Sequence, residues 1–283
     1  MNFKALKPYF TQEIANLYDN EEAESLYYMA LEKLTGWGRS KIIFNQEQEI
    51  QTTELKLIKD LIVQLQQGKP IQYILEEAHF YGMTLMVSPA VLIPRAETEE
   101  LVDWIIEEVK GIQPAGNLLD VGTGSGCIAI SLKKHLPEWN VAALDISESA
   151  LKVAAHNALQ NKVIVEFIHA DVLQFQTAQK YDLIVSNPPY IKEDEKEQMH
   201  TNVMEHEPHS ALFVSNQNPL VFYKAIAALA EKNLNEKGYL FFEINEYLGQ
   251  ETVEMLAAYG FENIVLRKDM QGKDRMICCR KNA

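Results

Sequence analysis

The chain has little cysteine, few basic residues and no long apolar run. Its 283 residues include 3 cysteines, two of which, Cys278 and Cys279, are adjacent, so they provide neither a disulfide framework nor a spaced set of metal ligands. No uninterrupted apolar segment approaches the thickness of a bilayer, and Met1 to Phe10 lacks the charged-then-apolar pattern of a secretion signal. We therefore expect a cytoplasmic protein that has no membrane anchor and no bound metal.

The balance of charge is acidic. There are 26 Lys and Arg residues against 40 Asp and Glu, which gives a formal net charge of −14. Proteins that hold a nucleic-acid backbone generally present a basic face, because phosphate neutralisation drives that binding. The chain has no Lys/Arg-rich arm, so we expect no direct binding of nucleic acid.

The first part of the chain has the pattern of a helical bundle. Apolar residues recur at helical spacing, most clearly at Leu55, Ile58, Leu61, Ile62 and Leu65. No cluster of catalytic residue types occurs there. We interpret residues 1–76 as a small helical-bundle domain that recognises and positions a substrate.

Residues 77–94 change to β character and predict a hairpin that links two domains. His79 to Val87 is rich in β-forming residues, with Gly82 as the turn, and Val91 to Ile93 resumes the pattern after Ser88-Pro89.

Residues 95–283 alternate between strand and helix patterns. A helix follows Arg95, and the final segments near 264–268 and 275–279 predict an antiparallel hairpin. The other expected strands are 118–121, 141–144, 163–169, 181–186 and 239–244, and the other expected helices are 126–135, 149–160, 220–234 and 250–259. This alternation predicts an α/β domain whose mostly parallel sheet is covered on both faces.

A glycine-rich turn, Asp120 to Gly126, separates the first strand of this domain from its helix. Glycines let the backbone turn sharply and let a ligand approach closely, so we predict that this turn binds a cofactor through Gly122, Thr123, Gly124, Ser125 and Gly126. A dinucleotide fingerprint needs a sixth-position glycine where Cys127 stands, which disfavours an NAD-dependent dehydrogenase without excluding it. Cys127 lies at a helix start, where a thiol can be activated, although a structural role is the simpler interpretation.

Two carboxylates follow the next strands. Asp145 ends the second strand about 20 residues beyond the glycines, where a carboxylate can accept hydrogen bonds from both ribose hydroxyls of an adenosine cofactor. Asp171 follows the third strand, where it could accept the adenine amino group while Val172 packs on the ring. Capping of a local turn is the other interpretation of Asp171, and the sequence leaves both open.

The most informative residues are Asn187-Pro188-Pro189-Tyr190, which follow the apolar strand 181–186. They place an amide, a rigid turn and an aromatic ring at the carboxyl edge of the sheet, where open α/β sheets bind ligands. Two prolines stiffen the loop and leave carbonyl groups free to accept hydrogen bonds. Such a corner is suited to gripping a planar –NH2 group, although it could also be a tight turn whose ring packs inward.

Taken in this order, the glycine loop, Asp145, Asp171 and the Asn-Pro-Pro-Tyr tetrapeptide resemble a class I S-adenosylmethionine-dependent methyltransferase of the branch that acts on planar nitrogens. Phe80-Tyr81-Gly82 and the segment from Val91 to Glu99 are similar to segments of the HemK/PrmC family. Those enzymes methylate the glutamine side-chain amide in the Gly-Gly-Gln motif of peptide chain release factors. The resemblance covers nearly the whole chain, with Ala96 in place of the usual proline, a change that removes no functional group.

The resemblance implies a Rossmann-like methyltransferase domain, S-adenosylmethionine as cofactor and release factors as protein partners. It implies that Asn187, which also lies beside the cofactor, and the Pro188 carbonyl accept the two hydrogens of the substrate amide, while Tyr190 packs against its plane. Arg95 and Glu97 would shape the wall around the methionine or the substrate. The predicted substrate site therefore comprises Arg95, Glu97, Asn187, Pro188, Pro189 and Tyr190.

Two other functions remain open at this point. The same tetrapeptide serves enzymes that methylate exocyclic amino groups of adenine or guanine, although such enzymes must grip phosphates. A catalytically inactive binding module that keeps the fold is the other, and the intact glycines, Asp145 and Asn187 argue against it.

Overall fold

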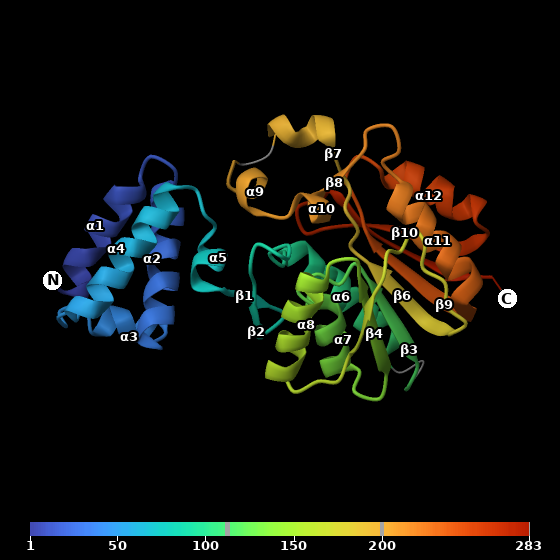
Figure 1. Ribbon diagram of the computed structural model, residues 1–283, viewed down its shortest axis with the longest axis horizontal. Coiled ribbons are helices and arrows are strands. Elements are labelled where there is room, and N and C mark those ends of the chain that lie inside the picture. Colours follow the sequence, from blue (N-terminus) through green and yellow to red (C-terminus); the bar gives the residue numbers. More distant parts are fainter. Residues whose placement is uncertain (111–113, 199–200, 283) are drawn as a thin grey trace. The chain divides into compact units, whose positions relative to one another are not determined.

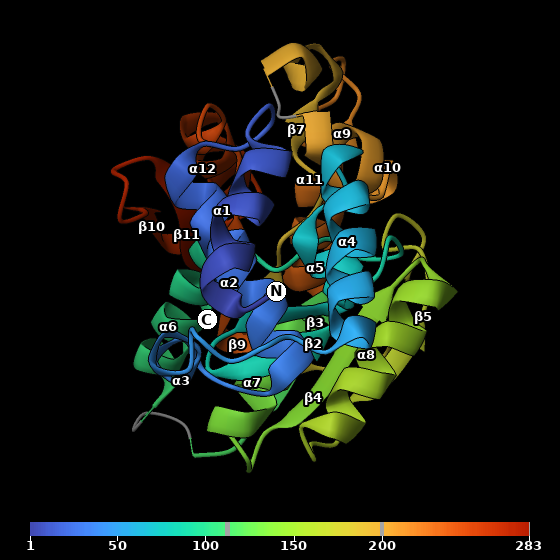
Figure 2. The same ribbon diagram turned by 90° about the vertical axis from the view of Figure 1, so that its left-hand side faces the viewer.

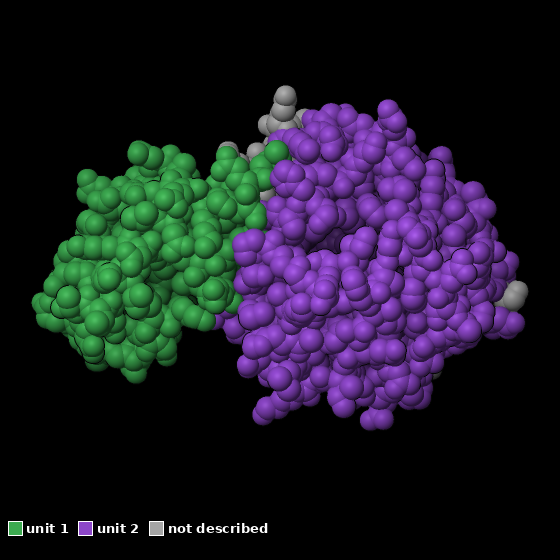
Figure 3. Space-filling view, viewed as in Figure 1, with its two compact units in different colours: residues 1–76, 200–206 green, residues 77–199, 207–283 purple. Residues whose placement is uncertain are grey.

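The computed structural model describes residues 1–110, 114–198 and 201–282. The chain forms two compact units, residues 1–76 with 200–206 and residues 77–199 with 207–283, which Figure 3 shows in different colours. Each unit has its own hydrophobic core.

Unit 1 is helical, as the sequence predicts. Helices α1, α2 and α4 run alongside one another in it (Figure 2). Ile58, Leu61, Ile62 and Leu65 of the predicted stripe are buried in its core, and Leu55 is half-buried against them. The helices are α1 (Phe3–Ile14), α2 (Asn20–Thr35), α3 (Arg39–Phe44), α4 (Thr52–Gln66), α5 (Ile71–Leu75) and α9 (Thr201–His206).

Helix α9 comes from a distant part of the sequence, and no pattern indicated that it belongs to unit 1. It is attached by polar contacts to the first unit: Asn202 Nδ2 donates to the Tyr18 hydroxyl at 3.3 Å, and His206 Nε2 lies 3.4 Å from the Gln67 carbonyl oxygen.

Unit 2 contains a seven-stranded sheet with the order β10-β11-β9-β6-β3-β4-β5. Its strands are β3 (Asn117–Val121), β4 (Asn140–Asp145), β5 (Glu166–His169), β6 (Tyr181–Ser186), β9 (Leu234–Glu243), β10 (Phe261–Lys268) and β11 (Asp274–Lys281). Strands β9, β6, β3, β4 and β5 pair in parallel, whereas β11 pairs antiparallel with both β9 and β10. The predicted mostly parallel sheet with a C-terminal antiparallel hairpin is confirmed.

Helices cover both faces of this sheet (Figure 1). They are α6 (Ala96–Val109), α7 (Cys127–His135) and α8 (Glu148–Gln160) on one face, and α11 (Val221–Asn233) and α12 (Gly249–Ala258) on the other. Because side chains alternate along a strand, Leu118 packs into the first cluster and Leu119 into the second. The same alternation sends the adjacent cysteines Cys278 and Cys279 to opposite faces, so they cannot form a disulfide with each other.

The predicted hairpin consists of β1 (Glu77–Phe80) and β2 (Met83–Met86), which pair antiparallel. Tyr81 and Gly82 connect them with φ angles of 46° and 71°, the left-handed values of a two-residue hairpin turn. The prediction that Val91 to Ile93 resumes the strand was wrong. The side chains of Val91 and Ile93 are buried, but the Ile93 N–H donates to the Glu207 carboxylate at 3.3 Å, so a side chain replaces a partner strand.

Two further segments differ from expectation. Strand β5 begins at Glu166 rather than 163, because Lys162 has a φ of 57° and the Val163 N–H bonds to the Ala158 carbonyl, which turns the chain after α8. The sequence also gave no prediction for the short elements after β6. They are β7 (Ile191–Lys192), η1 (Glu193–Gln198), α10 (His209–Leu212) and β8 (Phe213–Val214).

No helix within the described ranges has both the length and the apolar character needed to cross a membrane.

Candidate active site

Strands β3 and β6 are neighbours in the sheet, although the chain visits β4 and β5 between them. Such a switch point leaves a crevice at the carboxyl ends of the strands. Unit 2 has a cavity of about 360 Å³ there. Among the predicted site residues, those lining this cavity are Arg95, Gly122, Thr123, Gly124, Ser125, Asp145, Asp171, Val172, Asn187, Pro188 and Pro189. Three others, Glu97, Gly126 and Tyr190, are not among its lining residues.

The glycine loop is built around the buried carboxylate of Asp120. One of its oxygens accepts hydrogen bonds from the Thr123 hydroxyl at 2.6 Å and from the Ala129 N–H at 3.2 Å. Gly122 and Gly124 have φ angles of 74° and 54°, a conformation that favours glycine, and an added Cβ at either would meet no protein atom within 4 Å. The two glycines therefore leave open space next to the cavity that they line.

Asp120 itself is fully buried, and desolvation raises its pKa from 3.8 to about 7, a shift that its bonds to Thr123 and Ala129 limit. Its second oxygen has no hydrogen-bond partner among the described residues. The Asp120 carboxylate thus shapes the loop. Because burial disfavours its charged form, the free-energy cost of keeping it there increases as the pH rises.

Gly126 has a different role from the other two glycines. A Cβ on this residue would lie 2.8 Å from Ile130 Cδ1 and 3.1 Å from the Ala154 Cβ. Close packing of α7 against α8 accounts for this glycine, which does not face the cavity.

Asp145 and Asp171 both line the cavity while they organise the backbone beside it. The two carboxylate oxygens of Asp145 accept the N–H groups of Gly124 at 2.9 Å and Ser147 at 2.8 Å. The Asp171 carboxylate accepts the Leu173 N–H at 2.9 Å, so it caps a local turn. Each oxygen keeps a lone pair for a ligand, because a carboxylate can accept about four hydrogen bonds. For Asp171 the two open interpretations are therefore compatible.

The Asn-Pro-Pro-Tyr corner begins where β6 meets the end of β3. The buried Ser186 hydroxyl donates to the Val121 carbonyl at 2.6 Å and ties the two strand ends together. Asn187 is half-buried and Pro188 is buried, and both line the cavity. The Asn187 side-chain nitrogen donates to the Thr98 hydroxyl oxygen at 3.4 Å.

Tyr190 is turned toward the protein interior. Its ring packs against the cluster that α11 and α12 form with the sheet, and its hydroxyl donates to a Glu243 carboxylate oxygen at 3.2 Å. Desolvation and the nearby Glu243 charge raise its pKa far above the usual value. The predicted stacking of this ring on a substrate amide stays a prediction.

Arg95 lines the cavity and is paired with Glu207, whose carboxylate is almost fully buried. The Arg95 Nη2 atom lies 2.5 Å from Glu207 Oε1, while Oε2 of the same carboxylate accepts the Ile93 N–H. This pair holds the segment before α6 against the chain before α10. Glu97, in the first turn of α6, is half-buried and is not among the residues that line the cavity.

Sequence reasoning missed Thr98, Glu243 and Glu207. Glu243 ends the apolar run of β9, so it obeys the rule that singled out Asp145, a carboxylate at the carboxyl end of a parallel strand. Thr98 stands among the acidic residues at the start of a helix, and no pattern distinguished it from them. Glu207 stands in a stretch without a recognisable pattern, and only the fold brings it to Arg95.

Cys127 lines the cavity, but it is not an activated thiol. Desolvation and the neighbouring Asp120 raise its pKa to about 12. A thiol that stays protonated at neutral pH is a poor nucleophile, which agrees with a structural role.

Comparisons with known proteins agree with this geometry. A family model described as "Methyltransferase small domain" matches residues 100–213, and one described as "PrmC N-terminal domain" matches residues 9–75. A ribosomal protein L11 methylase from Lactobacillus delbrueckii subsp. bulgaricus has a similar structure, with a TM-score of 0.51 and 21% identity over 70% of this chain and 84% of that one. A 16S rRNA methyltransferase from T. thermophilus has a TM-score of 0.54 and 18% identity over 73% of this chain and 50% of that one.

The fold, the cavity at its switch point, the match to a methyltransferase family model and full-length relatives together define a class I methyltransferase. Relatives along the whole chain give the particular family. The release factor glutamine methyltransferase of Flavobacterium psychrophilum is 46% identical over 98% of both chains, and that of Bacteroides thetaiotaomicron is 40% identical over 96% of this chain and 98% of its own. The chain belongs to the release factor glutamine methyltransferase family, and the resemblance seen in its sequence is confirmed.

Enzymes of this class take their methyl group from S-adenosylmethionine, and the T. thermophilus structure is described in complex with it. The residues present fit this donor. The cavity lies within the range of volumes that suits a cofactor, the two open glycines allow close approach, and Asp145 offers a carboxylate at the cavity wall. The apolar residues Ile146, Val172 and Phe222 also line it and provide surfaces for a flat ring. The alternative of a dehydrogenase is set aside.

Proposed function

We propose that this chain transfers a methyl group from S-adenosylmethionine to the side-chain amide nitrogen of the glutamine in the Gly-Gly-Gln motif of peptide chain release factors, and thereby modulates translation termination. Full-length similarity to enzymes named for this activity carries the proposal. The position of Asn187 and Pro188 on the cavity wall supports it.

The chemistry requires alignment more than acid–base catalysis. A carboxamide nitrogen is a weak nucleophile, because its lone pair is delocalised into the carbonyl group. When bound, S-adenosylmethionine supplies an electrophilic methyl group on a sulfonium centre. The protein's task is to hold the nitrogen still and in line, a contribution that can be worth several orders of magnitude in rate.

Asn187 and Pro188 would perform this task together. The Asn187 side-chain oxygen accepts one hydrogen of the substrate –NH2 group and the Pro188 main-chain carbonyl accepts the other. Both oxygens also stabilise the positive charge that develops on the nitrogen as the new bond forms. The methylated cation is acidic enough to lose its proton to water, so no strong base is needed.

Arg95 and Glu97 would contribute to the walls of the site. Arg95 lines the cavity and its guanidinium group is held by Glu207, so it can present its remaining N–H groups to a carboxylate or a carbonyl. Glu97 is not among the lining residues, so we propose a supporting electrostatic role for it.

Unit 1 would recognise the protein substrate. It is helical, it has no cluster of catalytic residue types, and residues 9–75 match the family's N-terminal domain. An acidic chain without a basic arm is suited to a protein partner rather than to nucleic acid. The place of action would be the cytoplasm, where translation termination occurs.

The test is methyl transfer from a labelled donor to purified release factors. We expect label on the wild-type factor, and none on a variant whose Gly-Gly-Gln glutamine is replaced by alanine. Ribosomal and transfer RNA serve as parallel substrates in the same experiment. Label on RNA, or equal label on the alanine variant, would contradict the proposal.

A further inference from the structure

The side chain of Asn187 lies at the end of a chain of hydrogen bonds that starts from a buried carboxylate. Asn187 Nδ2 donates to Thr98 Oγ1 at 3.4 Å, and the Thr98 hydroxyl donates to Glu243 Oε2 at 2.6 Å. These residues come from the loop after β6, the first turn of α6 and the end of β9. Thr98 and Glu243 are 2% and 1% exposed, so neither can replace these partners with bulk water.

Each hydrogen bond in this series can be donated in only one direction. A carboxylate has no proton to donate, so Glu243 can only accept. The single hydroxyl proton of Thr98 is committed to the shorter bond with Glu243, and the Thr98 oxygen is therefore left as an acceptor. The group of Asn187 that faces Thr98 must then be its –NH2 end, which leaves the carbonyl oxygen to point elsewhere.

This direction matters because the two ends of an asparagine amide have nearly the same shape but opposite hydrogen-bonding character. With its oxygen toward the substrate, Asn187 can accept a hydrogen from an –NH2 group. With the amide turned over, it would present its own hydrogens to those of the substrate, and the two donors would repel each other.

We propose that Thr98 and Glu243 are positioning residues that fix the orientation of the Asn187 amide, so that its oxygen faces the methyl-accepting nitrogen. This inference rests on the proposed function, because it concerns the side chain that grips the substrate amide. Neither residue needs to touch the reacting atoms.

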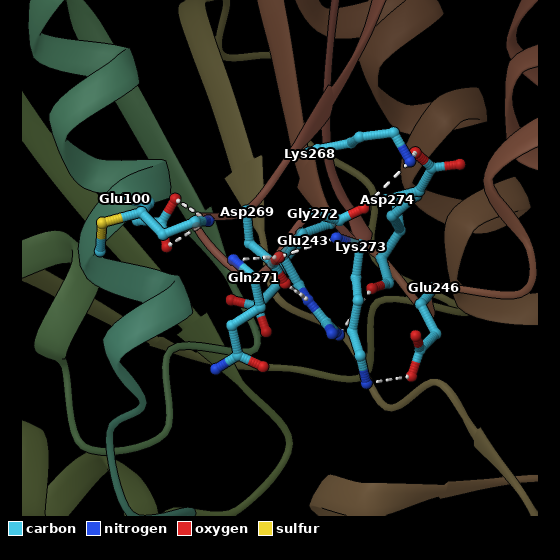
Figure 4. A network of polar contacts seen from close by, with 12 residues as sticks. Glu100, Glu243, Glu246, Lys268, Asp269, Gln271, Gly272, Lys273 and Asp274 are labelled. Atoms are coloured by element: carbon cyan, nitrogen blue, oxygen red, sulfur yellow. Dashed lines mark hydrogen bonds and ion pairs between the residues drawn. The ribbon is translucent and has the colours of Figure 1, made fainter.

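The surroundings of Glu243 support this role. Its other oxygen accepts the Tyr190 hydroxyl, its main-chain carbonyl accepts the Tyr223 hydroxyl at 3.1 Å, and the Arg275 cation acts on it from β11. Arg275 is held by Asp269, whose network in the turn between β10 and β11 is shown with Glu243 in Figure 4. Tyr190, a residue of the tetrapeptide itself, is thus linked to Asn187 through Glu243 and Thr98.

Protonation of Glu243 would allow the hydrogen bonds between Asn187, Thr98 and Glu243 to reverse their donor–acceptor direction. Burial is the main reason that its pKa is raised, the repulsion of Glu97 adds to this, and Thr98, Arg275 and Tyr190 oppose it. A protonated Glu243 can donate to Thr98, which frees the Thr98 proton to bond the Asn187 oxygen and turn the amide over. Turnover should therefore decline on the acid side at a higher pH than an ordinary glutamate would cause.

A matched pair of variants tests the inference. Thr98→Val keeps the shape of the side chain and removes the hydroxyl group, whereas Thr98→Ser keeps the hydroxyl group. For transfer to a Gly-Gly-Gln substrate we expect Thr98→Val to lower kcat about tenfold or more, the effect of losing one buried hydrogen bond. Thr98→Ser should retain most of the turnover. Thr98 also lines the cavity, but both variants nearly keep the shape of its side chain, so we expect them to bind the methyl donor with an affinity close to that of the wild type, measured by calorimetry.

Glu243→Gln provides a second, independent readout. It mimics the protonated state, so we expect low turnover and the loss of the acidic limb of the pH–rate profile. Equal turnover of Thr98→Val and Thr98→Ser, or an unchanged acidic limb in Glu243→Gln, would overturn the inference. If Glu243→Gln does not fold, the Thr98 pair decides alone.

A measurement without substrate separates this inference from the proposed function. The side-chain amide protons of Asn187, assigned by nuclear magnetic resonance from the signal lost in Asn187→Asp, should exchange slowly with water in the wild type and in Thr98→Ser, and faster in Thr98→Val. Equal exchange rates in the three proteins would contradict the positioning role, whether or not release factors prove to be substrates. Failure of the wild type to methylate them, with the predicted exchange rates intact, would count against the proposed function alone.

Discussion

The loop after β3 and the loop after β6 lie at the carboxyl ends of neighbouring strands and line the same cavity, yet different forces hold them in shape. The first is a backbone structure, in which glycines adopt left-handed conformations around the Asp120 carboxylate. The second is a side-chain structure, in which Asn187 is oriented by residues from two other elements.

This difference explains how each loop can fail. The first loop depends mainly on its own backbone conformation, although Asp145 of the next strand also holds the Gly124 N–H. A substitution within this loop therefore acts through conformational strain or through an atom that enters the ligand's space. The loop after β6 depends on side chains that are distant in the sequence, so it can lose its function while its own residues are unchanged.

Removal of the Asn187 side chain should have the largest effect. Asn187→Ala deletes one of the two groups that grip the substrate amide, and we expect kcat to fall about 10²–10³-fold, as when one donor of a transition-state site is lost. Donor affinity should change much less, because the β3 loop is untouched. Kinetics and calorimetry on the same protein measure both quantities, and near-normal turnover would contradict the assignment.

The pH dependence of stability tests the Asp120 centre of the first loop. Its pKa is raised to about 7, so between about pH 4 and pH 7 the folded state holds a proton that the unfolded state releases. The stability that it contributes is therefore present at low pH and is lost as the pH rises through 7. We expect a loss of about 3 kcal/mol between pH 5 and pH 8 that Asp120→Asn does not show. Urea unfolding of both proteins at the two pH values measures this loss. An equal loss of unfolding free energy in the wild type and in Asp120→Asn would contradict the raised pKa of Asp120.

Two glycine variants sharpen the comparison within the first loop, and a third, outside it, serves as their control. Gly124→Ala places a Cβ in the open space beside the cavity, and we expect donor affinity to fall about tenfold, with a strain of about 1–2 kcal/mol. Gly126 also has a positive φ, of 81°, so Gly126→Ala adds a collision with Ile130 and Ala154 to the same strain, and we expect the collision to cost about a further 1–3 kcal/mol in unfolding free energy, as overpacking of a core does.

Gly36→Ala is the matched control for this pair. It has a φ of 67°, meets nothing within 4 Å and lies in unit 1, so it reports the backbone strain alone. Thermal unfolding and donor titration of the three variants separate strain, collision and ligand exclusion. Donor affinity equal in Gly124→Ala and Gly36→Ala would show that the loop does not contact the donor.

The smallest effect is expected at Asp171. Asp171→Ala removes both the cap on the Leu173 N–H and the predicted contact with the adenine amino group, and we expect donor affinity to fall only a few-fold, the effect of a single exposed hydrogen bond. Calorimetric titration of the donor measures it. Unchanged donor affinity would mean that Asp171 only caps the local turn and does not contact the adenine amino group.

Much of unit 2 could be predicted because its signals are local. Strand β6 was placed at its observed bounds. The glycine turn, Asp145 and Asn187 were expected at the carboxyl edge of the sheet, where residues of all three line the cavity, because each ends or follows an apolar strand. The resemblance to a family then supplied the order and the chemistry.

The residues behind the site could not be predicted, since their partners are distant in sequence. Thr98 and Glu243 are 145 positions apart, and Arg95 and Glu207 are 112 positions apart. The hydrogen bond of the Tyr190 hydroxyl could not be predicted either, because its partner Glu243 is 53 positions away in the sequence.

The decisive experiment is a structure of the enzyme with S-adenosylhomocysteine and a Gly-Gly-Gln peptide. We expect Asn187 to keep its nitrogen on Thr98, and its oxygen to lie within hydrogen-bond distance of the peptide's glutamine nitrogen, about 3 Å, with the Pro188 carbonyl as the second acceptor. An Asn187 side chain turned away from that nitrogen, or a glutamine held by other residues, would contradict it.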